Sequence, residues 1–301
     1  MENLEGIIVA TLTPMNSKGS KIDLSPIKDY IDFLYERGVH GIFVNGTTGE
    51  GLLLDLDEKK KLLYEFKKHA EGKLKVISHC GALDYREIEE MIEFSKNLAV
   101  DAVAVVTPFY YRYSDDEILC FYRFICEKAG EIPVLGYNIP GLTNNWIKTE
   151  IVEKLKNNYS NFIGVKDSSG NFTHILSLLR TGLNIFVGYD EAFLASLVMG
   201  AKGCVSGPGG VFPEFFDKVW KYFKEGKLSN AYEYQEILSQ FSLAIGNGGD
   251  IPLLKSVLKL RGIDLGSVRF PLKETSKEKL ETVKRKLKEL SINYSIDLKI
   301  Y

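Results

Sequence analysis

The amino-acid sequence predicts an α/β fold: a closed (β/α)8 TIM barrel with a C-terminal helical extension. Short apolar runs and segments of helical period alternate along most of the chain. The runs are continuously apolar, which is typical of parallel strands that are covered by helices on both faces. A barrel of about 250 residues with an appendage also fits a chain of 301 residues.

Eight apolar runs are the predicted strands. They are Gly6–Thr11, Gly41–Asn45, Leu74–His79, Ala102–Thr107, Pro133–Asn138, Phe162–Lys166, Asn184–Gly188 and Gly203–Ser206. Helical spacing of apolar residues follows in the intervening segments, for example in Leu24–Arg37 and Asp57–Ala70. A closed barrel fits better than an open doubly wound sheet, because the first strand leads into Thr11-Leu12-Thr13-Pro14 and not into a glycine-rich dinucleotide turn.

After the eighth strand the pattern becomes helical. The predicted helices are Glu214–Lys224, Leu228–Ala244, Pro252–Arg261 and Ser276–Leu290. We therefore divide the chain into a barrel, residues 1–226, and a C-terminal helical region, residues 227–301. The tail Asn293–Tyr301 is expected either to fray or to pack as a short strand.

Composition argues against several functional classes. Hydrophobic residues at 45% and charged residues at 26% are typical of a soluble globular protein. A net charge of -2 leaves no basic surface for a nucleic acid. The chain has neither a secretory signal nor an apolar run of about 18 residues, so we expect a cytoplasmic protein without a membrane span. The four cysteines and the histidines lack metal-binding spacing, which predicts mostly buried, reduced thiols and no metal.

Lys166 is the predicted nucleophile. It ends the apolar run Phe162–Val165 and precedes a turn of small polar residues. A lysine at such a strand end loses water, which disfavours its charged form and lets the neutral amine attack a carbonyl to form a Schiff base. Considered alone, the pattern favours a surface lysine at a strand end, because catalytic lysines are rare among lysines.

Other predicted strand ends add chemistry, because the active site of such a barrel lies at the carboxyl ends of its strands. Thr47 and Thr48 follow the second strand in a glycine-rich turn whose N–H groups and hydroxyls can converge on a carboxylate. The alternative is an ordinary strand-to-helix turn. Tyr137, one strand away from Lys166, can pass protons to an imine, or it is a plain amphipathic tyrosine.

Together these stretches resemble the dihydrodipicolinate synthase and N-acetylneuraminate lyase family of pyruvate-dependent class I aldolases. The resemblance covers nearly the whole chain. Its motifs are GTTGE at 46–50, TPFYY at 107–111, YNIP at 137–140, GVKD at 164–167 and GYDE at 188–191. Each motif is weak alone, but five in order at strand ends form a specific combination.

The resemblance implies a role for each matching residue. Lys166 is expected to bind the keto carbon of pyruvate, and Tyr137 to shuttle protons. Thr47 and Thr48 are expected to hold the pyruvate carboxylate, with Thr47 joining the relay. Tyr110 matches a tyrosine that completes the relay in a neighbouring subunit, which implies a homotetramer built as a dimer of dimers.

Members of this family differ in the acceptor aldehyde. The synthase of the lysine pathway has an arginine soon after the YNIP proline, where this chain has Gly141-Leu142-Thr143. Loss of that charge-assisted contact, worth roughly 1.5 to 3 kcal/mol, argues against the synthase. Gly188-Tyr189-Asp190-Glu191 instead resembles the sugar-acid lyases, in which Asp190 and Glu191 would bind polyol hydroxyls. The alternative for both carboxylates is N-terminal capping of a helix over Ala192–Met199 and complementation of its dipole.

Further residues complete the expected substrate site. They are Ser168, Gly188, Val205 and Ser206. The stretch Ser206-Gly207-Pro208-Gly209-Gly210 departs from the pattern of N-acetylneuraminate lyases, which favours a shorter acceptor such as glyceraldehyde.

The predicted reaction is therefore reversible cleavage of a 2-keto-3-deoxy sugar acid, 2-keto-3-deoxygluconate in the first instance, into pyruvate and glyceraldehyde, without a cofactor. N-acetylneuraminate lyase and 4-hydroxy-tetrahydrodipicolinate synthase stay open as alternatives. From a different class, a non-catalytic sensor could use the barrel to bind an oxo acid, because a fold alone does not fix function. The expected partners are pyruvate and a small aldehyde or sugar acid, with no nucleic acid and no membrane.

Overall fold

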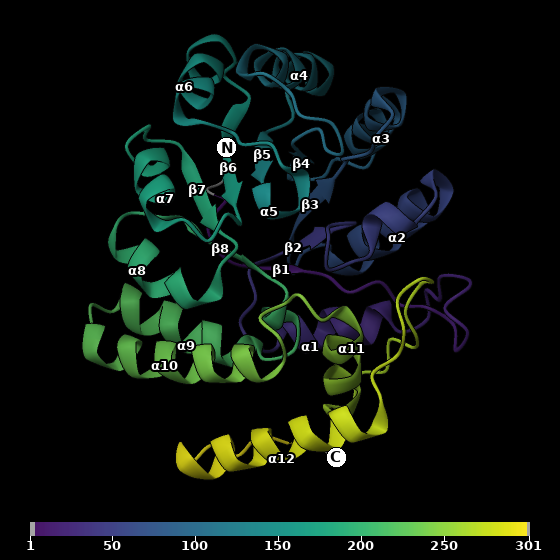
Figure 1. Cartoon of the computed structure of the whole chain (residues 1–301), viewed down its shortest axis with the longest axis vertical. Coiled ribbons are helices and arrows are strands. Elements are labelled where there is room, and N and C mark those ends of the chain that lie inside the picture. Colours follow the sequence, from purple (N-terminus) through teal and green to yellow (C-terminus); the bar gives the residue numbers. More distant parts are fainter. Residues whose placement is uncertain (1–3, 300–301) are drawn as a thin grey trace.

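Parallel strands close into a barrel in the computed structural model, which describes residues 4–299 (Figure 1). The strands are β1 (Gly6–Ala10), β2 (Gly41–Val44), β3 (Lys75–His79), β4 (Ala102–Val106), β5 (Val134–Asn138), β6 (Phe162–Asp167), β7 (Asn184–Val187) and β8 (Gly203–Ser206). Each strand pairs with the next in sequence, and β8 pairs with β1. The predicted (β/α)8 barrel is therefore confirmed.

Helices surround the strands, and the last four gather along one side of the barrel (Figure 1). The helices between strands are α1 (Ile27–Tyr35), α2 (Leu56–Ala70), α3 (Tyr85–Asn97), α4 (Asp115–Ala129), α5 (Pro140–Thr143), α6 (Thr149–Asn158), α7 (Phe172–Leu179) and α8 (Phe193–Val198). The C-terminal helices are α9 (Pro213–Lys224), α10 (Leu228–Ala244), α11 (Ile251–Leu260) and α12 (Lys277–Asn293). The predicted C-terminal helices thus agree with the structure to within a few residues at each end.

Local capping determines where several helices begin. Asp55 and Glu58 form a capping box at the start of α2, and Ser114 and Glu117 form another at the start of α4. The helix predicted from Leu24 begins only at Ile27, with Pro26 as its N-cap residue. Each of these signals satisfies or removes a backbone N–H that the first helical turn leaves without a partner.

The apolar core has two parts on the two faces of the barrel. One cluster fills the barrel interior and includes Ile8, Phe43 and Tyr137, whereas the other lies between strands and helices and includes Ile7 and Val9. Successive residues of a strand point to opposite faces, so Ile7 and Ile8 enter different clusters. Burial on both faces explains why the strands are continuously apolar.

The C-terminal helices share the outer part of this core. Phe241 of α10 packs against Phe212 and Phe215, with ring centres 5.4 and 4.7 Å apart. The division of the chain into a barrel, residues 1–226, and a C-terminal helical region, residues 227–301, stays a prediction. The predicted tail begins at Asn293, which is the last residue of α12. No strand follows up to residue 299, but Ile296 and Leu298 pack on the core. Residues 300–301 lie outside the described part of the chain.

The sequence also made predictions about cysteine burial and membrane spans. Cys80, Cys126 and Cys204 are buried as expected, whereas Cys120 on the outer side of α4 is exposed. Among residues 4–299, no helix has both the length and the apolar character needed to cross a membrane.

Candidate active site

Lys166 lies inside the barrel beside Tyr137. The pairing of β5 with β6 places these two residues opposite each other on neighbouring strands. Only 4% of Lys166 and 2% of Tyr137 are exposed. The Lys166 Nζ lies 3.9 Å from the centre of the Tyr137 ring and 4.2 Å from that of Phe43. The amine is thus enclosed by aromatic rings near the carboxyl end of the barrel.

Burial is the main influence on the charge of Lys166. Loss of water lowers the pKa of this amine below its ordinary 10.5, whereas Tyr137 and then Asp190 partly oppose the shift. A larger fraction of the amine is then neutral at a given pH than in an exposed lysine. The neutral amine is the form that attacks a carbonyl.

The turn after β2 brings Thr47 to Tyr137. The Thr47 Oγ1 and the Tyr137 hydroxyl oxygen lie 3.1 Å apart and form a hydrogen bond. The turn is tight: Asn45 and Glu50 have φ of 63° and 57°, and a Cβ at Gly51 would lie 1.9 Å from the Asn45 carbonyl oxygen. The sequence-predicted relay pair therefore lies together at the mouth of the barrel.

Thr48 is half-buried on the same turn. A Cβ at Gly207 would lie 3.0 Å from the Thr48 Oγ1 and 3.6 Å from the Gly248 Cα. The loop after β8 thus passes close to Thr48 and to the loop between α10 and α11, and glycine at position 207 permits the close passage.

Glu50, the last residue of the GTTGE motif, anchors this turn to the C-terminal helices. Its carboxylate lies 2.7 Å from the Lys255 Nζ on α11 and accepts a hydrogen bond of 2.6 Å from the Arg269 backbone N–H. Glu50 and Lys255 are each only 3% exposed. Breaking such a buried pair by removing one partner costs about 3 to 5 kcal/mol, because the other charge stays buried. The turn that carries Thr47 and Thr48 therefore depends on residues 227–301.

Asp190 is buried near Lys166 at the start of the short helix η2 (Asp190–Ala192). Burial raises the pKa of its carboxyl group from 3.8 to about 7, and hydrogen bonds from Ser206 and Ser242 oppose the rise. The Ser242 Oγ of α10 lies 3.5 Å from Asp190 Oδ2. Neither η2 nor α8 has a side-chain cap, so the capping part of the alternative is wrong, but Asp190 and Glu191 both lie in the first turn of η2, where acidic side chains complement a helix dipole.

Glu191 lies outside this buried group. Its side chain is exposed and accepts hydrogen bonds of 2.5 Å from the Tyr189 hydroxyl and 3.1 Å from the Asn247 Nδ2. Asn247 belongs to the loop between α10 and α11. Glu191 is thus held at the rim, whereas Asp190 reaches the interior.

Four further predicted residues line the ends of β6, β7 and β8. A Cβ at Gly188 would lie 2.0 Å from the Ser168 Oγ, so a larger residue here would have to displace this half-buried serine side chain. Val205 belongs to the inner cluster with Phe43 and Tyr137. Ser206 is 2% exposed, and its Oγ accepts a hydrogen bond of 2.9 Å from the Gly209 N–H.

Tyr110 is not brought together with these residues in this chain. Its side chain is 79% exposed, and its φ of 78° lies in the left-handed region. The side chain stacks edge to face on Tyr111, with ring centres 5.0 Å apart. Its predicted role therefore requires a second chain.

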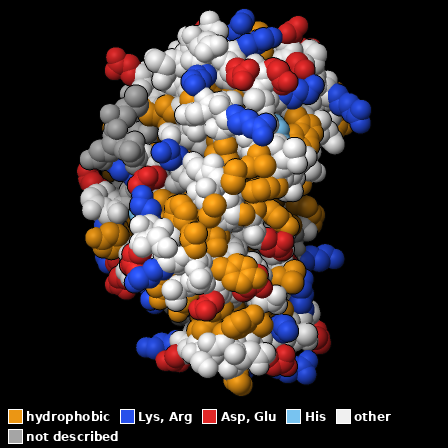
Figure 2. Space-filling model, turned by 90° about the vertical axis from the view of Figure 1, so that its left-hand side faces the viewer, with side chains coloured by type: hydrophobic (Ala, Val, Ile, Leu, Met, Phe, Trp, Pro, Cys, Tyr) orange, Lys and Arg blue, Asp and Glu red, His pale blue; other side chains and the backbone are white. Residues whose placement is uncertain are grey.

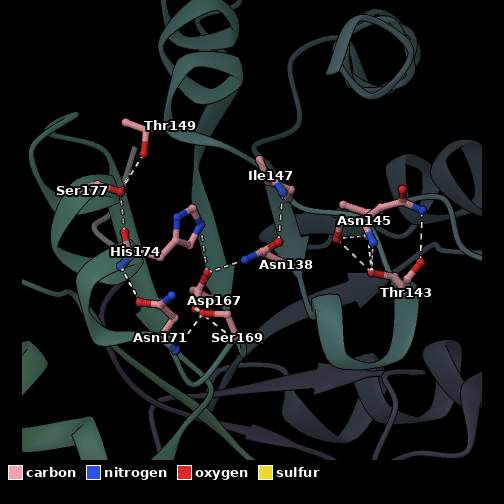
Figure 3. Close-up of polar contacts among 11 residues, drawn as sticks. Asn138, Thr143, Asn145, Ile147, Thr149, Asp167, Ser169, Asn171, His174 and Ser177 are labelled. Carbon is pink, nitrogen blue, oxygen red and sulfur yellow. Dashed lines mark hydrogen bonds and ion pairs between the residues drawn. The ribbon is translucent and has the colours of Figure 1, made fainter. Parts of the chain in front are cut away.

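A polar network joins the strand ends behind the reactive residues (Figure 3). Asp167 is fully buried and accepts hydrogen bonds from the Asn138 Nδ2 at 2.6 Å and from the Ser169 hydroxyl at 2.6 Å. The His174 Nε2 lies 3.5 Å from the same carboxylate. Because Asn138 follows Tyr137 and Asp167 follows Lys166, this network fixes the strand ends that present both side chains.

Sequence reasoning did not assign roles to several of these residues. Asn138 and Asp167 lie within quoted motifs, and their position one residue after Tyr137 and Lys166 is the signal that could have found them. Ser242 carries no such signal, because it reaches Asp190 from 52 positions along the chain. His79 is 4% exposed, and its Nδ1 lies 3.0 Å from the Asn45 carbonyl oxygen.

The model of the dihydrodipicolinate synthetase family matches residues 3–290. The chain belongs to this family. It is 32% identical to human N-acetylneuraminate lyase over 308 residues, covering 99% of this chain and 96% of that one. It is also 36% identical over 233 residues to an uncharacterized DapA-like lyase of Pyrococcus horikoshii, covering 76% and 79% of the two chains.

Solved structures of the dihydrodipicolinate synthetase family share the fold. A catalytic lysine mutant of the sialic acid aldolase of Ruminococcus gnavus superposes with a TM-score of 0.90 at 28% identity, covering 98% of this chain and 99% of that one. A dihydrodipicolinate synthase gives a TM-score of 0.90 at 28% identity, covering 96% of this chain and 100% of that one. The chain is accordingly a lyase of this family.

No group of three or more His, Cys, Asp or Glu side chains suited to a metal ion occurs within residues 4–299.

The raised pKa of Asp190 predicts a pH dependence of stability. Between about pH 4 and pH 7 the folded state keeps a proton on Asp190 that the unfolded chain has released. The free energy of unfolding of the wild type should therefore fall relative to Asp190→Asn as the pH rises through this range, by at most about 1.4 kcal/mol per pH unit. Urea unfolding of both proteins at several pH values measures the difference. If the free energy of unfolding of the wild type minus that of Asp190→Asn stays constant or rises with pH, the pKa of Asp190 is not raised in the folded protein.

Proposed function

We propose that the protein is a class I aldolase that cleaves a 2-keto-3-deoxy sugar acid reversibly to pyruvate and an aldehyde. The observation that carries the proposal is the enclosure of Lys166 beside Tyr137, with Tyr137 hydrogen-bonded to Thr47. A sensor that only binds an oxo acid needs neither a desolvated amine nor a hydroxyl relay.

The reaction follows from these groups. The neutral Lys166 amine adds to the keto carbon, and loss of water with uptake of one proton from the relay or solvent gives a protonated imine. This imine takes up the electron pair of the C3–C4 bond as that bond breaks, which yields an enamine. The proton of the C4 hydroxyl passes to the relay of Tyr137 and Thr47, and the aldehyde leaves. Protonation of the enamine at C3 and hydrolysis of the imine then release pyruvate and restore the amine.

The remaining predicted residues have roles in substrate binding. Thr47 and Thr48 would hold the carboxylate of pyruvate through their turn. The aldehyde portion would lie toward Asp190, with Ser206 and Ser242 beside it. Glyceraldehyde is the aldehyde favoured by the Ser206–Gly210 stretch. The similarity to proteins named N-acetylneuraminate lyase instead favours N-acetylneuraminate as the sugar acid, with N-acetylmannosamine as the aldehyde that its cleavage would release.

Borohydride trapping tests the Schiff base. Wild-type protein treated with pyruvate and borohydride should gain the mass of one reduced pyruvate adduct per chain, located on Lys166 by peptide mapping. Lys166→Ala should gain none, because its side chain has no amine to attack. Lys59→Ala is the matched control, since Lys59 is also a buried lysine but lies on the outer helix α2. A protein that binds pyruvate without any adduct would support the sensor instead.

An acceptor screen identifies the aldehyde. The kcat/KM for condensation of pyruvate with glyceraldehyde or N-acetylmannosamine should exceed that for aspartate semialdehyde by at least about tenfold. Aspartate semialdehyde has a carboxylate of its own, which Asp190 and Glu191 would repel. Asp190→Asn should lower kcat/KM for the preferred aldehyde by about 10- to 100-fold. The pyruvate adduct should persist in this variant. Preference for aspartate semialdehyde would reassign the protein to the lysine-pathway synthase.

We also propose that the chain forms a dimer of dimers. One apolar surface lies between α3 and α4 and next to the Tyr110 loop; its exposed residues are Leu83, Tyr85, Tyr110 and Tyr111. A second belongs to α7 and α8, where Phe172, Val198 and Met199 are exposed. Figure 2 shows an interrupted band of apolar side chains on the side of the molecule where these two helices lie. Exposed apolar patches commonly mark protein interfaces.

Light scattering tests this assembly. The wild type should have four times the 33.9 kDa mass of one chain. Leu83→Lys and Val198→Glu should each give a dimer, because each puts a charge into one apolar surface. Tyr64→Lys, at an exposed position of α2, is the control and should leave the tetramer intact. A monomeric wild type with full activity would refute both the assembly and the role of Tyr110.

A further inference from the structure

The loop that carries Tyr110 has little backbone support of its own. It follows β4 and spans residues 107–113, before the capping box of α4. Within the described part of the chain, its one backbone-to-backbone hydrogen bond joins the Thr107 N–H to the Tyr137 carbonyl, at 3.2 Å. Tyr110 has a φ of 78°, which is unfavourable for a residue with a bulky side chain. Something outside the loop must therefore hold this conformation.

The Asn145 side chain supplies that support. Its Nδ2 lies 2.8 Å from the Pro108 carbonyl oxygen and 2.8 Å from that of Tyr111, and its Oδ1 accepts a hydrogen bond of 3.0 Å from the Tyr113 N–H. These contacts lie on both sides of Tyr110 along the chain. Asn145 is only 3% exposed, so water does not compete freely for them.

Asn145 is itself fixed to the strand that carries Tyr137. The Thr143 Oγ1 accepts a hydrogen bond from the Thr107 hydroxyl at 2.9 Å. It also donates to the Asn145 carbonyl at 3.1 Å (Figure 3). Two residues later, the Ile147 N–H donates to the Asn138 Oδ1 at 2.9 Å. The segment around Asn145 thus joins the end of β5 to the Tyr110 loop.

We propose that Asn145 is a positioning residue for Tyr110: it fixes the Tyr110 loop against β5 so that the Tyr110 hydroxyl can enter the proton relay of a neighbouring subunit. The inference rests on the proposed function, in which Tyr110 completes that relay. Asn145 does not touch the reacting atoms in this assignment. Its effect on the reaction passes through the position of Tyr110 alone.

The test is a double-mutant cycle on proton exchange. Exchange of the pyruvate methyl protons with deuterated water, followed by proton NMR, needs the Schiff base and the relay but no acceptor aldehyde. Tyr110→Phe should slow this exchange by about 100-fold, a typical contribution of an acid–base group. Asn145→Ala should slow it to a similar degree. The double variant should be no slower than Tyr110→Phe, since residues that act as a unit are not additive.

Asn161→Ala is the matched control. The Asn161 Nδ2 also bridges two carbonyl oxygens, those of Cys126 and Gly130 at 2.8 Å each, but it precedes β6 at the opposite end of the barrel. This variant should exchange protons at the wild-type rate. Asn145→Asp keeps the size and the acceptor for the Tyr113 N–H but, when ionised, loses both donations. It should also exchange slowly, which preserves the test if Asn145→Ala does not fold.

The outcomes separate the inference from the proposed function. Proton exchange at the wild-type rate in folded Asn145→Ala or Asn145→Asp overturns the inference. So does exchange in the double variant that is slower than in Tyr110→Phe. If these variants still form the Lys166 adduct, the class I mechanism stays intact. Unchanged exchange in Tyr110→Phe overturns the inference as well, because the relay would then not need Tyr110. Absence of any pyruvate adduct on wild-type Lys166 overturns the proposed function itself.

Discussion

The burial of Lys166 is the constraint on which the site depends. A charged amine in an apolar barrel is costly, and the rings of Phe43 and Tyr137 offset part of that cost through their faces. Tyr137 and Asp190 stabilise the charged form, whereas desolvation favours the neutral one. The amine is therefore poised between a form that attacks a carbonyl and a form that resembles the protonated imine. Both forms are needed in one catalytic cycle, so neither influence can be removed without loss.

Buried polar side chains, and not additional strands or helices, hold the loops around this amine. Glu50 fixes the turn of Thr47 and Thr48 through Lys255, and Asp167 fixes the ends of β5 and β6 through Asn138. Glu50 and Asp167 each hold a loop through a few short hydrogen bonds in a region from which water is largely excluded. Hydrogen bonds are strong in such a region, and a buried polar group without a partner is destabilising. Precise loops can therefore surround the barrel mouth although they lack regular structure. Their geometry depends on residues far away in sequence, including the C-terminal helices.

Sequence reasoning could predict the barrel because its signal is local. Continuous apolar runs and helical spacing are read within short windows, and strand ends locate the candidate residues Lys166, Tyr137 and Thr47. Pro26 shifted the start of the first helix, a local effect that periodicity alone does not show. The approach of Ser242 to Asp190 and of Lys255 to Glu50 could not be foreseen, because each pair is joined only by tertiary packing. The same holds for any contact of Tyr110 with a second chain.

The charges at the barrel mouth bear on which aldehyde the site accepts. Asp190 lies near Lys166, and Glu191 lies at the rim. Leu142 is a 63% exposed apolar side chain within the stretch Gly141-Leu142-Thr143, in which the synthase pattern has an arginine. An acceptor with its own carboxylate would approach two acidic groups without a cationic partner from Leu142, which is unfavourable. A polyol aldehyde carries no charge and presents hydroxyls that carboxylates accept well. Because the Asp190 carboxyl group has a pKa of about 7, it can also donate one hydrogen bond to the substrate when protonated. The electrostatics of the site therefore support the proposal of a sugar-derived aldehyde over an amino-acid aldehyde, whatever the length of the sugar chain.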